Sequence, residues 1–425
     1  MTSRRSFLRL GAHGLAGLSL ADVFRLQAHA KGASSDMAVI LYWMAGGPSQ
    51  LETFDPKPDA PAEVRGPFGS TATRVPGVRF SEMLPKLAAH ADHLAVVRSL
   101  RHQHSVHDDA SHWVQTGQPL LNARQNGQQF PAQGSVVAAL RHDPAAAMPA
   151  YVCIPQAYSN PLGFYQKAAF LGPRFDPTAA GGVPYRGVDN GPDLRLNPLL
   201  DEGRLTGRAA LLSDMAGQPP DAFQAKALDM LRSPAVRAAF DLSRVPAKVR
   251  DGYGRHLWGQ AALMARRLVE AGVKFVTINH YEADTDWWDD HTAIEKNMRK
   301  RLPLFDGALA ALIADLRQTG LDRRVLVVAV GEFGRSPRID AQAGRGHWPG
   351  AFSAMLFGAG VPGGRVVGAT TANAGEPKDR PLGPADLVAT IYKVLGIDPH
   401  MTIDDKVRRP VKLVEGGEPI AELFA

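Results

Sequence analysis

The chain has 425 residues, of which 45% are hydrophobic and 21% are charged, and its formal net charge is +6. This composition is typical of a folded globular protein with a large buried core, and the charge is too small to predict a nucleic-acid partner. Cys153 is the single cysteine, which excludes an internal disulfide and a cysteine-based zinc site, so any metal site must use His, Asp and Glu side chains.

The first thirty residues contain the parts of an export signal in their usual order. Arg4 and Arg5 precede a weakly apolar stretch at residues 10–26, and the small-polar-small sequence at 28–30 is typical of a signal-peptidase site. We therefore predict a twin-arginine signal peptide at residues 1–30. The twin-arginine translocation machinery would export the folded protein to the periplasm or another extracytoplasmic compartment. The alternative is an ordinary N-terminal helix that contains two adjacent arginines.

No stable membrane span is expected. The apolar stretch of the signal is interrupted by glycines, His13 and Asp22, and no apolar run of membrane-spanning length follows it. The signal also holds four arginines and one aspartate, so the chain that remains after its removal is near +3.

After the signal, the first half of the chain begins with a clear strand and ends in a region with few signals. The apolar run at 38–44 ends at two glycines and a proline, which predicts a strand buried on both faces. Residues 83–95 have helical spacing, and a strand begins within 94–97. Residues 117–220 are rich in Gly, Pro and Asn, so we expect long loops or an inserted cap there.

The second half alternates between amphipathic helices and buried strands. Helices are predicted at 254–271, 302–319 and 384–395, and strands at 274–278, 324–330 and 352–357. This alternation predicts an α/β fold with a mostly parallel central sheet flanked by helices. Because no internal repeat or clear break divides the chain, we expect a single domain at 31–425, with a loop-rich insertion around 117–220.

Polar clusters follow the predicted strands. The clusters at 279–291, 331–338 and 344–349 contain Asp, Glu, Arg and His, and a fourth cluster at 101–112 contains four histidines. Ligands bind beyond the carboxyl ends of the strands in such sheets, so these loops are expected to share one edge. Imidazole and carboxylate groups are the ligands of hydrolytic zinc, manganese or iron sites. Arg335, Arg338 and Arg345 have the forked donors that clamp a phosphate or sulfate group.

Several strings resemble a known family. They are WMAGGPS at 43–49, TFDPKPD at 53–59, GEFGRSP at 331–337, GHWP at 346–349 and KDRP at 378–381. Together they resemble the large bacterial family called domain of unknown function 1501, from about Val39 to the C-terminus. That family is similar to the alkaline phosphatase and sulfatase superfamily. The resemblance implies a central sheet of that type and a metal centre.

The resemblance also implies site residues. Asp289 and His291 resemble the superfamily's Asp and His ligand pair, although their spacing is shorter here, and His347 resembles its later lone histidine. The superfamily's Asp-His-Gly is replaced by Glu332 and the two residues after it, so one histidine ligand is lost.

Two further departures concern the first strand and the nucleophile. Ala45 and the glycines after it replace the first-strand Asp-Gly pair, so another ligand is lost. The nucleophilic Ser or Thr position falls near His107, with Ser105 two residues away. One metal site is therefore expected, whereas the second is dismantled.

Two functions remain open at this point. The first is an exported, metal-dependent hydrolase of phosphate or sulfate esters. In that case a divalent zinc, manganese or iron ion is held by the predicted ligands Asp289, His291, Glu332 and His347. Arg335 would neutralise the anionic ester, and His107 would act as base, nucleophile or extra ligand. Glu332 could instead orient another ligand or pair with Arg335. The second function is that of a catalytically inactive, exported binding protein on the same fold.

Overall fold

The structure is a computed structural model. It describes residues 36–121, 128–154 apart from 142, 144 and 145, 165–180, 203, 207, 210–211, 229–230, 232–279 and 288–424. The predicted signal peptide lies outside the described residues. Within the described residues, no helix has the length and apolarity needed to cross a bilayer.

A sheet of eight strands runs through the described part of the molecule, in the order β12-β4-β11-β8-β1-β7-β5-β6. Adjacent strands are parallel except that β11 runs antiparallel to both of its neighbours, β4 and β8. The predicted mostly parallel sheet is therefore confirmed. The strands are β1 (Ala38–Trp43), β4 (Leu94–Leu100), β5 (Tyr151–Ile154), β6 (Thr178–Ala179), β7 (Phe275–Asn279), β8 (Val325–Val330), β11 (Phe352–Phe357) and β12 (Arg365–Val367).

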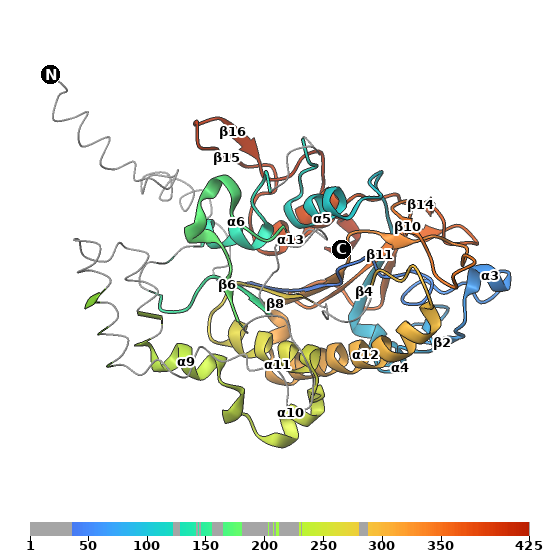
Figure 1. Cartoon of the computed structure of the whole chain (residues 1–425), viewed down its shortest axis with the longest axis horizontal. Helices are drawn as coiled ribbons and strands as arrows, with labels where there is room; N and C mark the ends of the chain where they lie inside the picture. Colours follow the sequence, from blue (N-terminus) through green and yellow to red (C-terminus); the bar gives the residue numbers. More distant parts are fainter. Residues whose placement is uncertain are drawn as a thin grey trace.

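Helices cover both faces of this sheet (Figure 1). One layer contains α4 (Pro85–Ala88), α9 (Pro234–Phe240), α10 (Ala247–Tyr253), α11 (Leu257–Glu270) and α12 (Ile294–Thr319). The other contains α5 (His107–Thr116), α6 (Gln133–Leu140) and α13 (Pro384–Val394). Successive side chains of β1 enter the two layers alternately: Ile40 and Tyr42 pack in the cluster of α11 and α12, whereas Val39 and Leu41 pack with α6 and α13. Both faces of β1 are therefore buried, which explains its continuous apolar run.

Short elements complete the fold around the sheet. They are α3 (Ala62–Arg65) and the two-stranded pairs β2 (Ser70–Ala72) with β3 (Arg79–Ser81), β9 (Gly334–Arg335) with β10 (His347–Trp348), β13 (Ala369–Thr370) with β14 (Pro377–Asp379), and β15 (Thr402–Asp404) with β16 (Pro410–Lys412). In the β9–β10 pair, His347 lies opposite Arg335. This pairing joins two of the loops that the sequence predicted to carry the site.

Some elements differ from the sequence-based expectations. The helix expected at 83–95 is reduced to α4, because Leu94 already belongs to β4. The α12 helix begins at Ile294, eight residues before the predicted start. The sequence did not indicate these first turns, because they are highly charged and show little apolar periodicity. Residues 117–220, expected to form loops or a cap, contain α6 and two strands of the central sheet among their described residues.

Candidate metal centre

Four segments that are distant in the sequence meet at the carboxyl edge of the parallel strands. The loop after β4 leads to His107, the first residue of α5, and β8 leads directly to Glu332. Asp289 follows β7, after residues 280–287, which lie outside the described part of the chain. Because β11 is antiparallel, its first residue lies at this same edge, and His347 just precedes it. The fold thus brings the predicted loops together.

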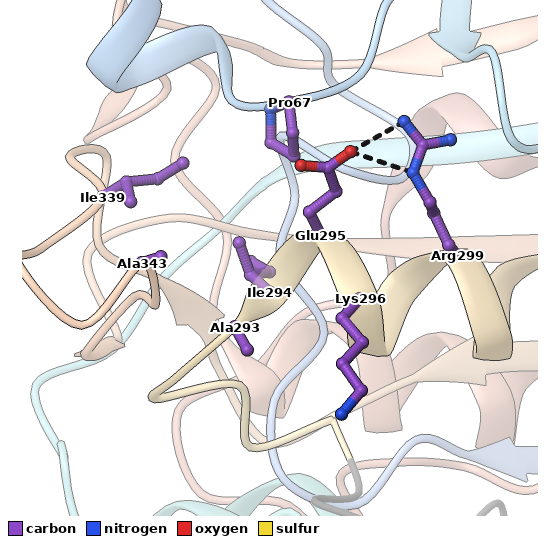
Figure 2. Close-up of a pocket in the computed structure, with 8 residues that line it drawn as sticks. All are labelled: Pro67, Ala293, Ile294, Glu295, Lys296, Arg299, Ile339 and Ala343. Atoms are coloured by element: carbon purple, nitrogen blue, oxygen red, sulfur yellow. Dashed lines mark hydrogen bonds and ion pairs between the residues drawn. The ribbon is translucent and has the colours of Figure 1, made fainter.

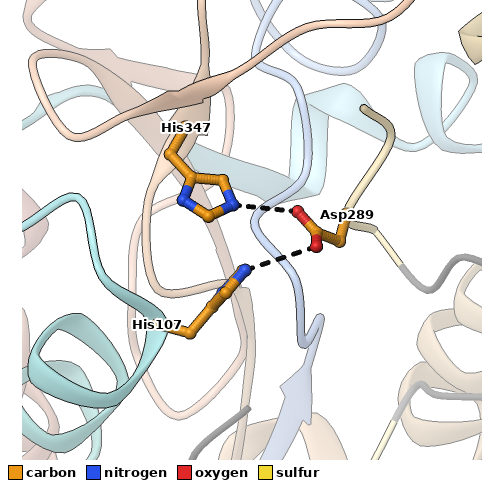
Figure 3. Close-up of side chains that lie close together, drawn as sticks. All are labelled: His107, Asp289 and His347. Atoms are coloured by element: carbon orange, nitrogen blue, oxygen red, sulfur yellow. Dashed lines mark hydrogen bonds and ion pairs between the residues drawn. The ribbon is translucent and has the colours of Figure 1, made fainter. Parts of the chain in front are cut away.

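His107, Asp289 and His347 form a group in which one ligand atom from each residue lies within 4.8 Å of the others (Figure 3). The Nε2 atom of His347 is 3.0 Å from Asp289 Oδ1, and the Nε2 atom of His107 is 3.4 Å from Asp289 Oδ2. Both imidazoles therefore point the same ring nitrogen at one carboxylate.

Hydrogen bonds on the opposite ring nitrogens, Nδ1, determine whether these Nε2 atoms carry a proton or a lone pair. The Nδ1–H group of His347 donates to the carbonyl oxygen of Ser105 at 2.7 Å, and that of His107 donates to Glu332 Oε1 at 2.6 Å. In a neutral imidazole, the other nitrogen then carries a lone pair. When both rings are neutral, two lone pairs and a carboxylate therefore face one another, and the buried Nε2 atom of His107 has no hydrogen-bond partner. Such a group is stabilised by a cation, so these residues fit a divalent metal ion.

The pKa values of His107 and Asp289 also indicate that positive charge is favoured between these side chains. Burial favours the neutral form of His107, but hydrogen bonds and charges from Asp289 and Glu332 outweigh it and raise the pKa of His107 to about 9. Burial likewise opposes ionisation of Asp289, yet the contacts with His107, His347 and Arg335 hold the pKa of Asp289 well below its usual range. The carboxylate is thus ionised, and the neighbouring imidazole holds a proton when no metal ion is bound.

His291 lies at the outer side of this group. Its Nε2 atom is 3.0 Å from Asp289 Oδ1 and 2.9 Å from His347 Nε2. Its side chain is 48% exposed, compared with 23% for His347 and 9% for His107. The group is therefore open to solvent on the His291 side, where this imidazole is a candidate fourth ligand.

Glu332 was predicted as a metal ligand, but the structure places it behind His107. Its side chain is fully buried, and Oε1 accepts hydrogen bonds from the Gly46 N–H at 2.8 Å and from His107. It does not belong to the group of three. The alternative left open by the sequence, in which Glu332 orients another ligand, is the one that this geometry matches.

Arg335 was predicted to neutralise an anionic substrate, and its position contradicts that role. The side chain is 0% exposed. Its guanidinium donates to Asp289 and to the carbonyl oxygens of Gly46, Gly47 and Arg345. With its donors used inside the protein, Arg335 holds Asp289 in place and does not reach the surface.

The other two arginines of the predicted anion clamp are also engaged elsewhere. Arg345 is fully buried and forms an ion pair with Glu52 at 2.7 Å. Arg338 is 75% exposed and pairs with Glu63 at 3.1 Å. A side chain in the interior cannot contact a substrate, so Arg345 supports the loops of the site.

The histidine cluster at 101–112 contributes one residue, His107, to the described group of ligands. His102 is buried, and its Nε2–H donates to the backbone oxygen of Glu332 at 2.7 Å. His112 is bound to backbone groups near Gln118 and Phe130. Sequence reasoning missed two hydrogen-bond partners, the Gly46 N–H of Glu332 and the Ser105 carbonyl oxygen of His347. Both are backbone groups, which every residue type has, so the sequence does not point to them.

A separate pocket of about 590 Å³ lies beside the start of α12 (Figure 2). Its walls are largely apolar, and an ion pair between Glu295 and Arg299 at 2.8 Å borders it. None of the residues that line it belongs to the group of His and Asp ligands. The pocket is therefore distinct from the candidate metal centre.

Comparison with known proteins places this chain in a family. The model of the family described as "Protein of unknown function (DUF1501)" matches residues 36–424. No protein with curated function matches the sequence.

Solved structures with similar folds include three from bacteria. A sulfatase from Pseudoalteromonas sp. has a TM-score of 0.40 and 12% identity, over 89% of this chain and 70% of that one. The phosphonate monoester hydrolase of Agrobacterium radiobacter has a TM-score of 0.36 and 14% identity, over 91% and 77%. The lipoteichoic acid synthase LtaP from Listeria monocytogenes has a TM-score of 0.38 and 11% identity, over 94% and 81%.

Proposed function

This chain belongs to the DUF1501 family, and we propose that it is an exported, metal-dependent hydrolase of phosphate or sulfate esters. The observation that carries the proposal is the convergence of His107 Nε2 and His347 Nε2 on the Asp289 carboxylate, at a solvent-accessible edge of the sheet. Open metal centres of this composition are the usual starting point of metal-assisted hydrolysis.

The donor set favours zinc, manganese or iron over calcium and magnesium. His107 and His347 each offer an imidazole nitrogen, Asp289 offers a carboxylate oxygen, and His291 is within reach as a fourth donor. Imidazole suits the transition metals, whereas magnesium and calcium prefer oxygen ligands. When bound, such an ion polarises an ester oxygen and lowers the pKa of a bound water molecule.

The residues of the chain supply the rest of the centre. Asp289 provides the negative charge that a divalent ion needs, and the buried Arg335 holds it in one orientation. His107 has its Nδ1–H fixed by Glu332, so its remaining nitrogen is available as a ligand. The proposal therefore assigns His107 to the metal ion, and not to nucleophilic attack.

Export is part of the proposal. Its support is the sequence at 1–30, where Arg4 and Arg5 precede an apolar stretch and a small-polar-small cleavage sequence. The twin-arginine route carries folded proteins, so the metal ion would be bound in the cytoplasm before the protein reaches the periplasm. Metal loading during cytoplasmic folding lets the cell choose the ion.

A second function, that of an exported binding protein without catalysis, is favoured by one observation. No carboxylate follows β1 in the turn that begins at Ala45, and the guanidinium of Arg335 contacts Asp289 and the backbone at this place. A fixed guanidinium there leaves no room for a second metal ion between these groups. Hydrolysis would have to proceed with one ion.

Metal analysis combined with an ester screen separates the two functions. The mature chain is purified, its bound metals are measured by elemental analysis, and nitrophenyl phosphate and sulfate esters are tested as substrates. We expect one metal ion per chain and ester turnover, both lost in His347→Ala and both retained in the control His400→Ala, which changes an exposed histidine. Folded wild-type protein without metal would rule out the metal centre, and bound metal without turnover of any ester would favour the binding protein.

A further inference from the structure

We propose that the loop of residues 332–335, here called the positioning loop, orients all three metal ligands without binding the ion itself. This inference rests on the proposed metal centre. It assigns a separate task to each of the three side chains of the loop: Glu332 acts on His107, Phe333 on the two imidazole rings, and Arg335 on Asp289.

Glu332 selects the nitrogen with which His107 faces the centre. Its Oε1 atom accepts the His107 Nδ1–H at 2.6 Å and the Gly46 N–H at 2.8 Å, so its position is fixed from two directions. The side chain is fully buried, which strengthens these hydrogen bonds. A carboxylate in this place also makes the imidazole a better electron donor to a metal ion.

Phe333 fixes the planes of the two imidazole rings. Its ring centroid is 4.9 Å from that of His107 and 4.7 Å from that of His347, and Phe333 is fully buried. The turn after β1 also packs closely against this ring, because a Cβ atom on Gly47 would lie 2.4 Å from it. The ring is thus held by contacts with the glycine turn and with the two ligands.

Arg335 fixes the third ligand. Its guanidinium contacts Asp289 and also donates to the Gly47 carbonyl oxygen at 2.9 Å and the Arg345 carbonyl oxygen at 3.1 Å. These additional hydrogen bonds satisfy the charge in the interior and set the direction of the ion pair. One oxygen of Asp289 is consequently held by an internal cation.

The backbone of the loop is anchored so that these three contacts are kept together. Gln50 accepts the Arg335 N–H at 2.9 Å and donates to the Arg335 carbonyl oxygen at 3.0 Å. A Cβ atom on Gly334 would lie 2.2 Å from the Ala351 carbonyl oxygen, so only glycine fits. Residues that hold ligands in this way typically change metal affinity about 10- to 100-fold when they are replaced.

Zinc titration of matched variants tests this inference. The dissociation constant for Zn²⁺ is measured by competition with a chromophoric chelator for the mature chain, Glu332→Gln, Glu332→Leu and Phe333→Leu. Asp306→Asn is the control, because Asp306 of α12 is also a buried carboxylate that accepts two backbone hydrogen bonds, but these come from Lys86 and Leu87 of α4 and not from the ligands.

A graded loss of affinity is expected. Gln keeps an oxygen for both hydrogen bonds of Glu332, so Glu332→Gln should bind Zn²⁺ at most about tenfold more weakly, and Glu332→Leu about 10- to 100-fold more weakly. Phe333→Leu should also weaken binding, whereas Asp306→Asn should stay within about twofold of wild type and one ion should still bind at saturation.

Three results would overturn the inference. Unchanged affinity in both Glu332→Leu and Phe333→Leu would show that the loop does not position the ligands. A Glu332→Gln variant as weak as Glu332→Leu would show that the negative charge of Glu332, and not the hydrogen bonds by which it orients His107, determines the affinity. A wild-type chain that binds no Zn²⁺ would remove the proposed function as well, which distinguishes that failure from the first two.

Discussion

At the scale of single residues, the chemistry of the centre depends on which nitrogen of each imidazole is already bonded. His107 and His347 both donate through Nδ1, one to a carboxylate and one to a backbone carbonyl, and both present Nε2 to Asp289. The side chain of Arg335 has no exposed surface, so it contacts groups of the protein interior only. The residues nearest to solvent, above all His291, are therefore those that a substrate would meet first.

Backbone strain close to the centre provides a test at one residue. Ala343, four residues before His347, has φ of +56° and is exposed. The left-handed region costs a non-glycine residue about 1–2 kcal/mol, part of which is offset by the greater freedom of glycine in the unfolded chain. We expect Ala343→Gly to raise the free energy of unfolding by about 0.5–1 kcal/mol in denaturant titrations.

The matched control for this change is Ala271→Gly. Ala271 is also exposed but has φ of −77°, where glycine offers no relief, so this change should lower the free energy of unfolding by about 0.5–1 kcal/mol. Equal effects of the two substitutions would show that the left-handed backbone at Ala343 carries no strain.

Sequence reasoning placed several of the candidate site residues at one edge of the sheet, but it did not give their individual contacts. Asp289, His291 and His347 could be singled out because His and Asp at strand ends are characteristic of metal sites. The role of Arg335 could not be predicted, because an arginine next to a loop is equally suited to a substrate and to buried carbonyl groups. Only the folded structure shows that its partners are Gly46, Gly47 and Asp289.

At the scale of elements, α5 connects the centre to the rest of the molecule. His107 begins this helix, and His112, one and a half turns later, is fully buried and fixes the chain that follows. Its Nδ1–H donates to the Gln118 carbonyl oxygen, while Nε2 accepts the N–H groups of Gln129 and Phe130. The two contacts at Nε2 require the neutral imidazole, because a protonated ring has no acceptor nitrogen.

A pH dependence of stability follows from this arrangement. Burial lowers the pKa of His112 to about 4, from an ordinary value near 6.5. Because the unfolded chain binds the proton more tightly, this contribution to stability is present above pH 6.5 and is lost as the pH falls towards 4. The loss due to His112 should reach about 2 kcal/mol at pH 5.

Unfolding at pH 7 and pH 5 measures this contribution. The difference in the free energy of unfolding between the two pH values should be about 2 kcal/mol smaller in His112→Gln than in wild type, whatever the stability of the variant at pH 7. The exposed His400→Gln should leave the difference unchanged. An equally large difference in wild type and His112→Gln would contradict the neutral, buried state of His112.

Elements with a continuous apolar run or clear amphipathic spacing could be predicted, and short ones could not. The β11 strand was expected at 352–357 and occupies Phe352–Phe357, because six consecutive buried residues leave a distinct pattern. The β5 strand has four residues and β6 has two, so their patterns are too short to stand out in a region rich in Gly and Pro. The β5 strand is positioned by pairing with β7, and β6 by pairing with β5, and both pairings join segments that are distant in the sequence.

At the scale of the whole molecule, we propose that the protein binds its metal ion in the cytoplasm and is then exported in the folded state. Replacing Arg4 and Arg5 together by lysine removes the twin-arginine feature but keeps the charge. We expect this variant to remain in the cytoplasm with its signal attached, as measured by cell fractionation and by the mass of the chain. The matched change of Arg9 to lysine should leave export intact. Efficient export of the double variant would show that the protein leaves the cytoplasm by another route, or that residues 1–30 are not a twin-arginine signal.

The central claim is that one divalent ion is bound by His107, Asp289 and His347, and anomalous diffraction tests it most directly. Crystals of the mature chain grown with Zn²⁺ are measured above and below the zinc absorption edge. We predict a single strong anomalous peak at about 2.0–2.2 Å from the two Nε2 atoms and the Asp289 carboxylate, with Glu332 and Arg335 outside the coordination sphere. A peak at another place, two peaks within the site, or no peak between these three side chains would contradict the account.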